Sequence, residues 1–198
     1  TLKYDATSAT LTAAANSALY VGTMRASANG QTEMSLGAPA AAVGGTNNKL
    51  YLWNAYQRVP TSATCRDSTD TWTYTTAAWR EKNASTSNAV NFVSGLAEGA
   101  VRASASAITS SDTSGIRRIN GIGLNGTTAI ASGCITGYID TQAGRFAQGI
   151  ATYAAPVALG LSTLTELEQS VATGTSTWYG DGGGATLIQT GMTVEMMM

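Results

Sequence analysis

The fold prediction starts from one stretch, Asp67-Ser-Thr-Asp-Thr-Trp-Thr-Tyr-Thr-Thr-Ala-Ala-Trp-Arg80. Trp72 and Tyr74 share one parity in it, and the threonines beside them occupy the other. A period of two is typical of a β-strand with one buried face, and these residue types favour a pleated surface. We therefore predict a strand with Trp72 and Tyr74 in the core. Trp79 and Arg80 are expected to leave the sheet at its rim.

A second strong strand pattern precedes this stretch, at residues 49–58. Tyr51 and Trp53 lie on one side of it, and leucines lie on the other side. Apolar residues on both sides are typical of a central strand that is covered on both faces. We expect Pro60 to end this strand, because proline has no backbone N–H to donate.

Short strand patterns with turn signals between them continue to the end of the chain. Further strands are predicted over residues 19–25, 90–93, 96–105, 117–124, 132–139, 145–155 and 187–196. Residues 164–171 fit helix or strand, but the following 175–179 favours a hairpin of two strands. The pattern predicts an all-β fold, an antiparallel β-sandwich of jelly-roll-like form, as a single domain over residues 19–198. Residues 1–18 are predicted to form an irregular N-terminal arm or linker.

Charged residues make up only 12% of the 198-residue chain, and its net charge is −1. Soluble domains average about a quarter charged residues, so the surface is expected to be neutral and rich in hydroxyl groups. Such a surface suits a particle exterior or a stacked assembly. Arg117-Arg118 is the only adjacent basic pair, which argues against a nucleic-acid partner. No apolar run approaches the roughly 18 residues that span a bilayer, so membrane insertion is not expected.

The chain has no histidine and two cysteines, Cys65 and Cys134. Histidine is the commonest general base and transition-metal ligand, so its absence weighs against a catalytic triad or a metal site. We predict no metal and no cofactor. Two free thiols are the preferred interpretation of the cysteines, and a single bridge is the alternative.

Residues 121–126, Gly-Ile-Gly-Leu-Asn-Gly, match the letters of a dinucleotide-binding fingerprint. That motif works only where a strand leads into a helix whose N-terminus holds the pyrophosphate. The residues that follow are too few and too often β-branched for such a helix. We therefore interpret the motif as a glycine-rich strand that packs closely against another backbone.

Paired carboxylates are the strongest hint of catalysis in this sequence. Glu166 and Glu168 share a face if their segment is a strand, and Asp181 lies near them if the hairpin forms. Glycosidases use two carboxylates held about 5 to 10 Å apart. No neighbouring feature of the sequence would raise the pKa of either glutamate, so we interpret them as a solvated strand face. No catalytic residue is assigned.

Aromatic and polar residues stand together at two predicted strand ends and form the candidate glycan-binding site. The residues are Trp79, Arg80, Trp178, Tyr179 and Asp181. An aromatic face can stack on the C–H groups of a sugar ring while a carboxylate accepts hydrogen bonds from its hydroxyls. The alternative is that these aromatic side chains close the end of the core.

Several short motifs together resemble a recurrent family of phage and prophage virion surface proteins. The motifs are Tyr20-Val-Gly-Thr-Met-Arg25, Gly30-Gln-Thr-Glu33, Leu52-Trp-Asn-Ala-Tyr-Gln-Arg58, Asp70-Thr-Trp-Thr-Tyr-Thr-Thr-Ala-Ala-Trp-Arg80, Gly121-Ile-Gly-Leu124, Leu167-Glu168 and Thr175-Ser-Thr-Trp-Tyr-Gly-Asp181. Proteins of this type are head-fibre, tail-fibre or spike components of tailed phages and of phage-like gene transfer particles. The resemblance covers residues 19–192.

The resemblance implies a non-enzymatic virion protein, exposed on the particle surface, that attaches the particle to a host surface polysaccharide. Two alternatives are a capsid decoration or cement protein and a capsule-depolymerising spike. The expected partners are other virion proteins, such as the capsid or a fibre base, and further copies of the chain. No heptad or collagen-like repeat is present, so we expect a globular knob in a closed homo-oligomer, with a trimer favoured.

Overall fold

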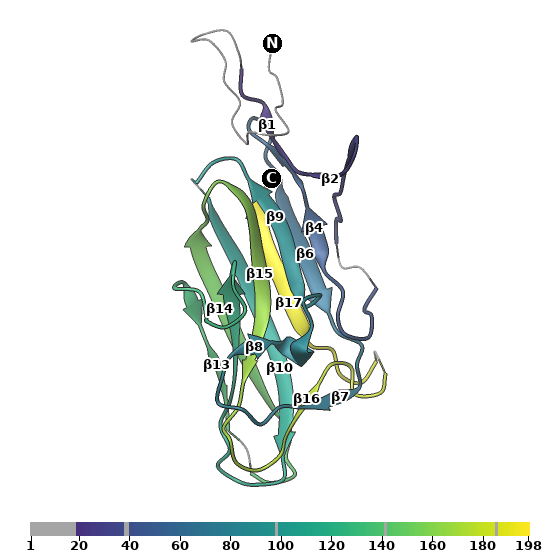
Figure 1. The fold of residues 1–198 in the computed structure, drawn as a ribbon, viewed down its shortest axis with the longest axis vertical. Coiled ribbons are helices and arrows are strands. Elements are labelled where there is room, and N and C mark those ends of the chain that lie inside the picture. Colours follow the sequence, from purple (N-terminus) through teal and green to yellow (C-terminus); the bar gives the residue numbers. More distant parts are fainter. Residues whose placement is uncertain (1–18, 38–39, 98, 141, 185) are drawn as a thin grey trace.

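The computed structural model describes residues 19–37, 40–97, 99–140, 142–184 and 186–198. Within these residues the chain is built from β-strands and one short 3-10 helix (Figure 1). The predicted N-terminal arm, residues 1–18, lies outside the described residues.

The larger sheet has seven strands and is organised around its longest member, β10. The order is β12-β14-β10-β16-β7, and β17 pairs with both β10 and β6. One half of β10 pairs with β17 and the other half with β16, so β10 joins the two ends of the sheet. The strands are β6 (Pro60–Arg66), β7 (Thr71–Thr73), β10 (Ala100–Ser111), β12 (Cys134–Ile135), β14 (Ala147–Pro156), β16 (Ser176–Tyr179) and β17 (Gly191–Met197).

The second sheet has six strands, in the order β13-β11-β15-β9-β4, with β8 also paired to β15. All of its pairs are antiparallel except β4 with β9, which is parallel. Its strands are β4 (Asn48–Leu50), β8 (Arg80–Glu81), β9 (Ala89–Ser94), β11 (Arg118–Leu124), β13 (Gly137–Ile139) and β15 (Gly160–Gln169). The 3-10 helix, Lys82–Ala84, directly follows β8.

Two small two-stranded sheets complete the fold at one end of the molecule (Figure 1). One consists of β1 (Gly22–Met24) and β5 (Leu52–Asn54), which we call the ribbon. The other consists of β2 (Ala26–Ala28) and β3 (Gln31–Thr32). The end of the sandwich that carries the ribbon is called the ribbon end below.

The chain changes sheet at every step from β9 to β16. Strands that alternate between two facing sheets give the jelly-roll-like arrangement that the spacing of short strands predicted. The prediction of an all-β antiparallel sandwich is confirmed.

The interior is divided into two apolar clusters of unequal size. The larger cluster lies at the ribbon end and includes Trp53, Phe92 and Met192. The smaller cluster consists of Ala107, Ile139 and Trp178, with Trp72, Tyr74 and Ala147 packed against it. A group of buried polar and charged side chains also lies in the interior and is described below.

The stretch that carried the fold prediction is less central than expected. β7 is only three residues long and forms an edge strand, paired with β16 alone. Trp72 and Tyr74 do face the core side, but both are half-buried and contact the smaller apolar cluster. Its regular alternation therefore identified a real strand at the margin of the sheet.

Two further predictions were wrong. The expected central strand at residues 49–58 is split into β4 and β5, at the edge of the fold, and Pro60 begins β6 instead of ending a strand. The expected hairpin of residues 164–171 and 175–179 does not form, because β15 and β16 belong to different sheets. Turn residues between two strands identify a reversal of the chain, but they do not distinguish a hairpin from a crossing between sheets.

Candidate functional site

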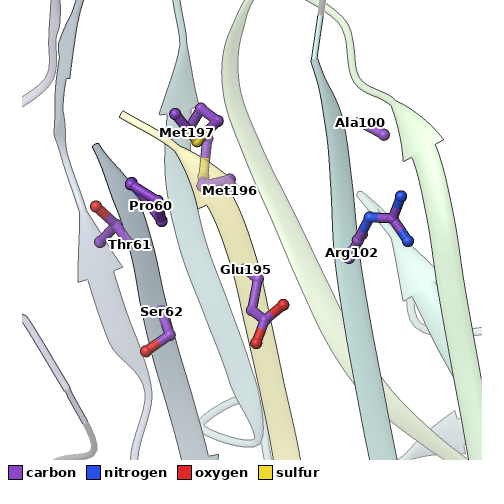
Figure 2. Close-up of a pocket in the computed structure, with 8 residues that line it drawn as sticks. All are labelled: Pro60, Thr61, Ser62, Ala100, Arg102, Glu195, Met196 and Met197. Carbon is purple, nitrogen blue, oxygen red and sulfur yellow. The ribbon is translucent and has the colours of Figure 1, made fainter. Parts of the chain in front are cut away.

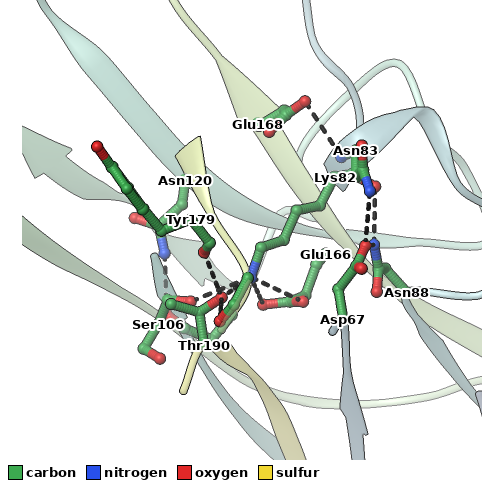
Figure 3. A network of polar contacts seen from close by, with 12 residues as sticks. Asp67, Lys82, Asn83, Asn88, Ser106, Asn120, Glu166, Glu168, Tyr179 and Thr190 are labelled. Atoms are coloured by element: carbon green, nitrogen blue, oxygen red, sulfur yellow. Dashed lines mark hydrogen bonds and ion pairs between the residues drawn. The ribbon is translucent and has the colours of Figure 1, made fainter. Parts of the chain in front are cut away.

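A network of buried charged and polar groups lies between the two sheets, and it contains the predicted glutamate pair (Figure 3). Glu166 and Glu168 are two residues apart on β15, so they point to the same side of the strand. That side faces the interior, since Trp72 of the opposite sheet contacts Glu168. The prediction of a solvated strand face was therefore wrong: both glutamates are buried.

Lys82 of the 3-10 helix is the cationic partner of Glu166. Its Nζ lies 3.3 Å from Oε2 and 3.4 Å from Oε1 of Glu166. The same ammonium donates to Thr190 Oγ1 at 2.9 Å and to the carbonyl of Ser106 at 3.4 Å. Lys82 and Glu166 are both almost completely buried, so solvent screens the attraction between them only weakly.

Glu168 is held by three different segments. Its Oε1 accepts from Arg80 Nε at 2.8 Å and from the backbone N–H of Asn83 at 3.2 Å. Its Oε2 accepts from Trp72 Nε1 at 2.8 Å. The guanidinium of Arg80 also lies 3.8 Å above the ring of Tyr74. Glu168 therefore ties the edge strand β7 to the facing sheet.

Asp67 organises the loops beside this pair. Its Oδ1 accepts from the backbone N–H groups of Thr69 and Gly44, at 2.9 and 3.1 Å. Its Oδ2 accepts from the side-chain amides of Asn83 and Asn88, at 2.9 and 3.0 Å. Burial alone would raise the pKa of Asp67, but the hydrogen bonds outweigh it and the pKa lies below its ordinary value.

The network has the perturbed acidity that functional sites often show, but its charged groups already have partners within the chain. Burial raises the pKa of Glu166 to about 7, against the opposing effect of Lys82. Burial also raises the pKa of Glu168, against the hydrogen bonds from Trp72 and Arg80. Each carboxylate contacts a cation and is closed off from solvent. The arrangement fits a structural link between the sheets better than an acid pair that receives a substrate.

Sequence reasoning found the two glutamates but missed the other members of the network, Asp67, Lys82 and Asn88. Lys82 is 84 residues away from Glu166 in the chain, so no local spacing connects them. One available signal was the Asp67-x-Thr69 pair, whose turn chemistry is realised in the hydrogen bond from the Thr69 N–H.

The predicted glycan-binding residues do not form one exposed site. Trp178 is only 1% exposed and belongs to the smaller apolar cluster, as the core-closure alternative proposed. Asp181 is buried and accepts from the N–H of Gly183. Arg80 belongs to the interior network.

Trp79 covers the glycine-rich strand β11. A Cβ at Gly121 would lie 3.1 Å from the Trp79 ring, and one at Gly123 would lie 2.4 Å from the carbonyl oxygen of Gly126. The Gly-Ile-Gly-Leu-Asn-Gly motif thus allows a ring and a backbone loop to pack directly on the sheet. No helix follows β11.

Tyr179 is the one predicted site residue whose ring lies in an aromatic pair on the outer face of the sandwich. Its ring is 5.0 Å from that of Phe146, with an angle of 55° between the two planes. Phe146 is 62% exposed. The Tyr179 hydroxyl is 2.9 Å from Ser110 Oγ, and Ile108 faces Tyr179 across the β10–β16 pair.

The strand residues beside this aromatic pair are uncharged and combine apolar with polar side chains. Ile108 is opposite Gln148 in the β10–β14 pair, and Ser106 is opposite the exposed Ile150. Phe146 was missed in the sequence. The sequence pattern could have located it, because small residues at 147, 149 and 151 alternate with Gln148 and Ile150. Residue 146 has the parity of 148 and 150, so Phe146 is on the outward side.

A groove of about 440 Å³ lies on the seven-stranded sheet, towards the ribbon end (Figure 2). It crosses β6, β17 and β10 and is lined by Pro60, Thr61, Ser62, Ala100, Arg102, Glu195, Met196 and Met197. Arg102 and Glu195 occupy opposite positions in the β10–β17 pair. None of its lining residues was predicted as a site residue.

Comparisons with known proteins gave no match to any family model and none to a curated protein. Among the described residues there is no group of three or more acidic, cysteine or histidine side chains that could hold a metal ion. Both cysteines are free thiols, and Cys65 is buried. None of the described segments is a helix long and apolar enough to cross a membrane.

Proposed function

We propose that this protein is a virion surface protein, a fibre or spike domain of a phage or phage-like particle that binds a host surface glycan. The observation that carries the proposal is the outward-facing pair of Phe146 and Tyr179. Two rings on an outer sheet face, with hydroxyl and amide groups beside them, offer the stacking and hydrogen bonding that a sugar needs.

The all-β sandwich and the resemblance to virion surface proteins support the same proposal. A single aromatic contact of this kind is weak, but many copies on one particle multiply weak contacts into strong attachment. The low charge of the chain, 12% of residues, leaves little long-range electrostatic selection of a partner. The glycan is therefore expected to be neutral.

The test is binding of the purified protein to a glycan array and to polysaccharide from candidate host cells. We expect Phe146→Ala to weaken binding about fivefold, because one aromatic contact contributes roughly 1 kcal/mol. Tyr138→Ala is the matched control, since Tyr138 is 55% exposed but lies on β13, in the other sheet. If no glycan binds, or if Phe146→Ala binds as tightly as the unmodified protein, the proposal is wrong.

A capsid decoration or cement protein is the second candidate. It is favoured by the exposed apolar side chains at the ribbon end, such as Leu19 and Met24, which suit a protein that fits between capsid subunits. Its test is deletion of the protein from the particle. Loss of capsid stability with normal adsorption would support it in place of attachment.

A depolymerase is the weakest of the three candidates. The only paired carboxylates that the sequence offered, Glu166 and Glu168, are buried and held by cations. Release of reducing sugar from host polysaccharide, abolished by Glu166→Gln, would be needed to support it.

A further inference from the structure

The groove and the aromatic pair lie on the same face of the seven-stranded sheet. Along β10 the even-numbered residues are exposed or half-buried, and the odd-numbered residues are buried. The even-numbered side chains therefore all point to the outer face. Arg102 lines the groove, and Ile108 is opposite Tyr179. The two sites are about 20 Å apart along this strand, since the six residues from 102 to 108 rise by about 3.3 Å each.

The Arg102 and Glu195 side chains of the groove are not bonded to each other. They are opposite in the β10–β17 pair, and both are exposed. Among the described residues neither side chain has a hydrogen bond or an ion pair, and the guanidinium of Arg102 is directed away from the Glu195 carboxylate (Figure 2). A charged hydrogen-bond donor and a charged acceptor therefore lie side by side, and both are open to a ligand.

This pair of charges favours a neutral ligand that both donates and accepts hydrogen bonds. A ligand anion would be repelled by Glu195, and a ligand cation would be repelled by Arg102. A sugar hydroxyl can accept from the guanidinium and donate to the carboxylate. Pro60, Ala100 and Met197 add apolar wall that fits the C–H groups of a sugar ring, and the volume of about 440 Å³ is typical of a small-molecule site.

A row of hydroxyl groups lies between the groove and the aromatic pair. Residues of four adjacent strands are opposite one another in it: Thr64 of β6, Thr193 of β17, Ser104 of β10 and Thr152 of β14. All four are exposed or half-buried, and the hydroxyls of Thr64 and Thr193 are 3.2 Å apart. The outward residues of β10 and β14 from this row to the aromatic pair are uncharged. The face between the two sites therefore offers hydroxyl contacts to a neutral chain.

We propose that a linear neutral polysaccharide lies along β10 on this face and occupies both sites at once. One sugar unit stacks on Phe146 and Tyr179, and another unit of the same chain enters the groove and hydrogen-bonds with Arg102 and Glu195. Once the first unit is bound, the other binds at a high effective concentration, so two weak contacts combine. This inference rests on the proposed function, since it gives the form of the glycan and adds a second subsite to the same attachment.

The test is the dependence of affinity on glycan length. The probe is neutral cell-surface polysaccharide purified from candidate host cells, cut with mild acid and separated into disaccharides and fragments that span more than about 20 Å. Isothermal titration calorimetry measures the affinity of each. We expect long fragments to bind the unmodified chain at least about tenfold more tightly than disaccharides, because only long fragments reach both sites.

The variant Arg102→Ala with Glu195→Ala removes the polar contacts of the groove and leaves the net charge unchanged. We expect its affinity for long fragments to fall about tenfold or more, because hydrogen bonds to charged groups are lost, and its affinity for disaccharides to stay the same. The matched control is Lys49→Ala with Glu33→Ala, which removes another pair of opposite charges, with Lys49 in the other sheet. The control should bind both probes as the unmodified chain does.

A second measurement uses the unmodified chain and so does not depend on the folding of a variant. Long fragments should shift the NMR signals of the backbone amides of Arg102, Glu195, Phe146 and Tyr179. Disaccharides should shift only the signals of Phe146 and Tyr179, because they occupy the aromatic site alone.

The possible failures distinguish this inference from the proposed function. If Phe146→Ala weakens the binding of long fragments but the Arg102 and Glu195 variant does not, the groove is not a subsite, and attachment through the aromatic pair stands. The inference is also wrong if the variant weakens both probes equally, or if long fragments bind the unmodified chain no more tightly than disaccharides. If no fragment binds the unmodified chain, the proposed function itself fails, and the inference fails with it.

Discussion

The two ends of this sandwich differ in where their polar and apolar side chains lie. At the ribbon end the interior is apolar, around Trp53 and Met196, and apolar side chains also cover the outside. Towards the other end the interior holds Lys82, Glu166 and Glu168, and the smaller apolar cluster has only three fully buried members. The same two sheets thus bury charged side chains towards one end and expose hydrophobic side chains at the other.

The difference separates side chains that have partners within the chain from side chains that remain exposed. The charged network is complete within one copy, because its carboxylates all have donors from the same chain. In the ribbon, by contrast, Met24 and Leu52 remain 70% and 48% exposed. A buried ion pair adds little net stability, but removing one of its partners is costly. Substitutions in the network are therefore expected to destabilise the fold strongly.

The largest effect is expected from breaking the buried pair. Lys82→Ala leaves Glu166 without its cation in the interior, and we expect a loss of about 3–5 kcal/mol in the free energy of unfolding at pH 8. Chemical denaturation measures this loss. The control is Lys49→Ala, which removes the exposed pair of Lys49 with Glu33, 2.5 Å apart.

The control variant should lose less than about 1 kcal/mol, since water and salt screen an exposed pair. Equal losses in both variants would mean that the interior network is no more important than a surface ion pair. The contrast between the two ends would then have no energetic basis.

The alternation of polar and apolar residues predicted the class of fold but not the position of its parts. Period-two patterns identified segments such as 117–124 and 145–155, which became β11 and β14. The same patterns wrongly predicted a central strand at residues 49–58. A ribbon with one exposed apolar face has the same sequence pattern as a strand that is covered on both faces. Exposed apolar residues of a strand are indistinguishable in sequence from core residues.

The candidate site was predicted in part, for a related reason. The sequence showed Glu166 and Glu168 on one face of a strand, but burial of a carboxylate depends on partners far along the chain. Here the partners are Lys82 and Arg80, more than 80 residues away. Trp178 and Tyr179 were placed together in one candidate site, but neighbouring residues of a strand point to opposite faces, and only the sheet pairing shows that Trp178 is the one that faces inward.

A smaller effect is expected from pH, and it is specific to the buried end. Glu166 has a pKa of about 7 in the folded chain, raised by burial, against an ordinary value of 4.5. The folded state therefore holds this proton more tightly, and the stability that it contributes is present at pH 4.5 and is lost as pH rises through 7. We expect unfolding free energy to fall by on the order of 2 kcal/mol between pH 5 and pH 8 from this group.

Glu166→Gln tests that assignment, because glutamine does not titrate. Urea unfolding of the unmodified chain and the variant at pH 5, 6, 7 and 8 should give a shallower pH dependence for the variant. Asp67 contributes in the opposite direction, since its lowered pKa makes its stabilisation disappear as pH falls, and it serves as an internal reference. An identical pH dependence in both proteins would show that Glu166 is not the group that titrates.

The smallest effect belongs to the ribbon end and appears only through concentration. If folded chains associate and unfolded chains do not, stability rises with protein concentration by mass action. For a trimer this rise is about 1 kcal/mol per chain for each tenfold increase, so the melting temperature should climb between 1 and 100 μM. The variant Met24→Ser with Leu52→Ser should melt at one temperature throughout, because both side chains are on the exposed face of the ribbon and support little of the fold within one copy. A concentration-dependent melt that persists in this variant would place the contact between copies outside the ribbon.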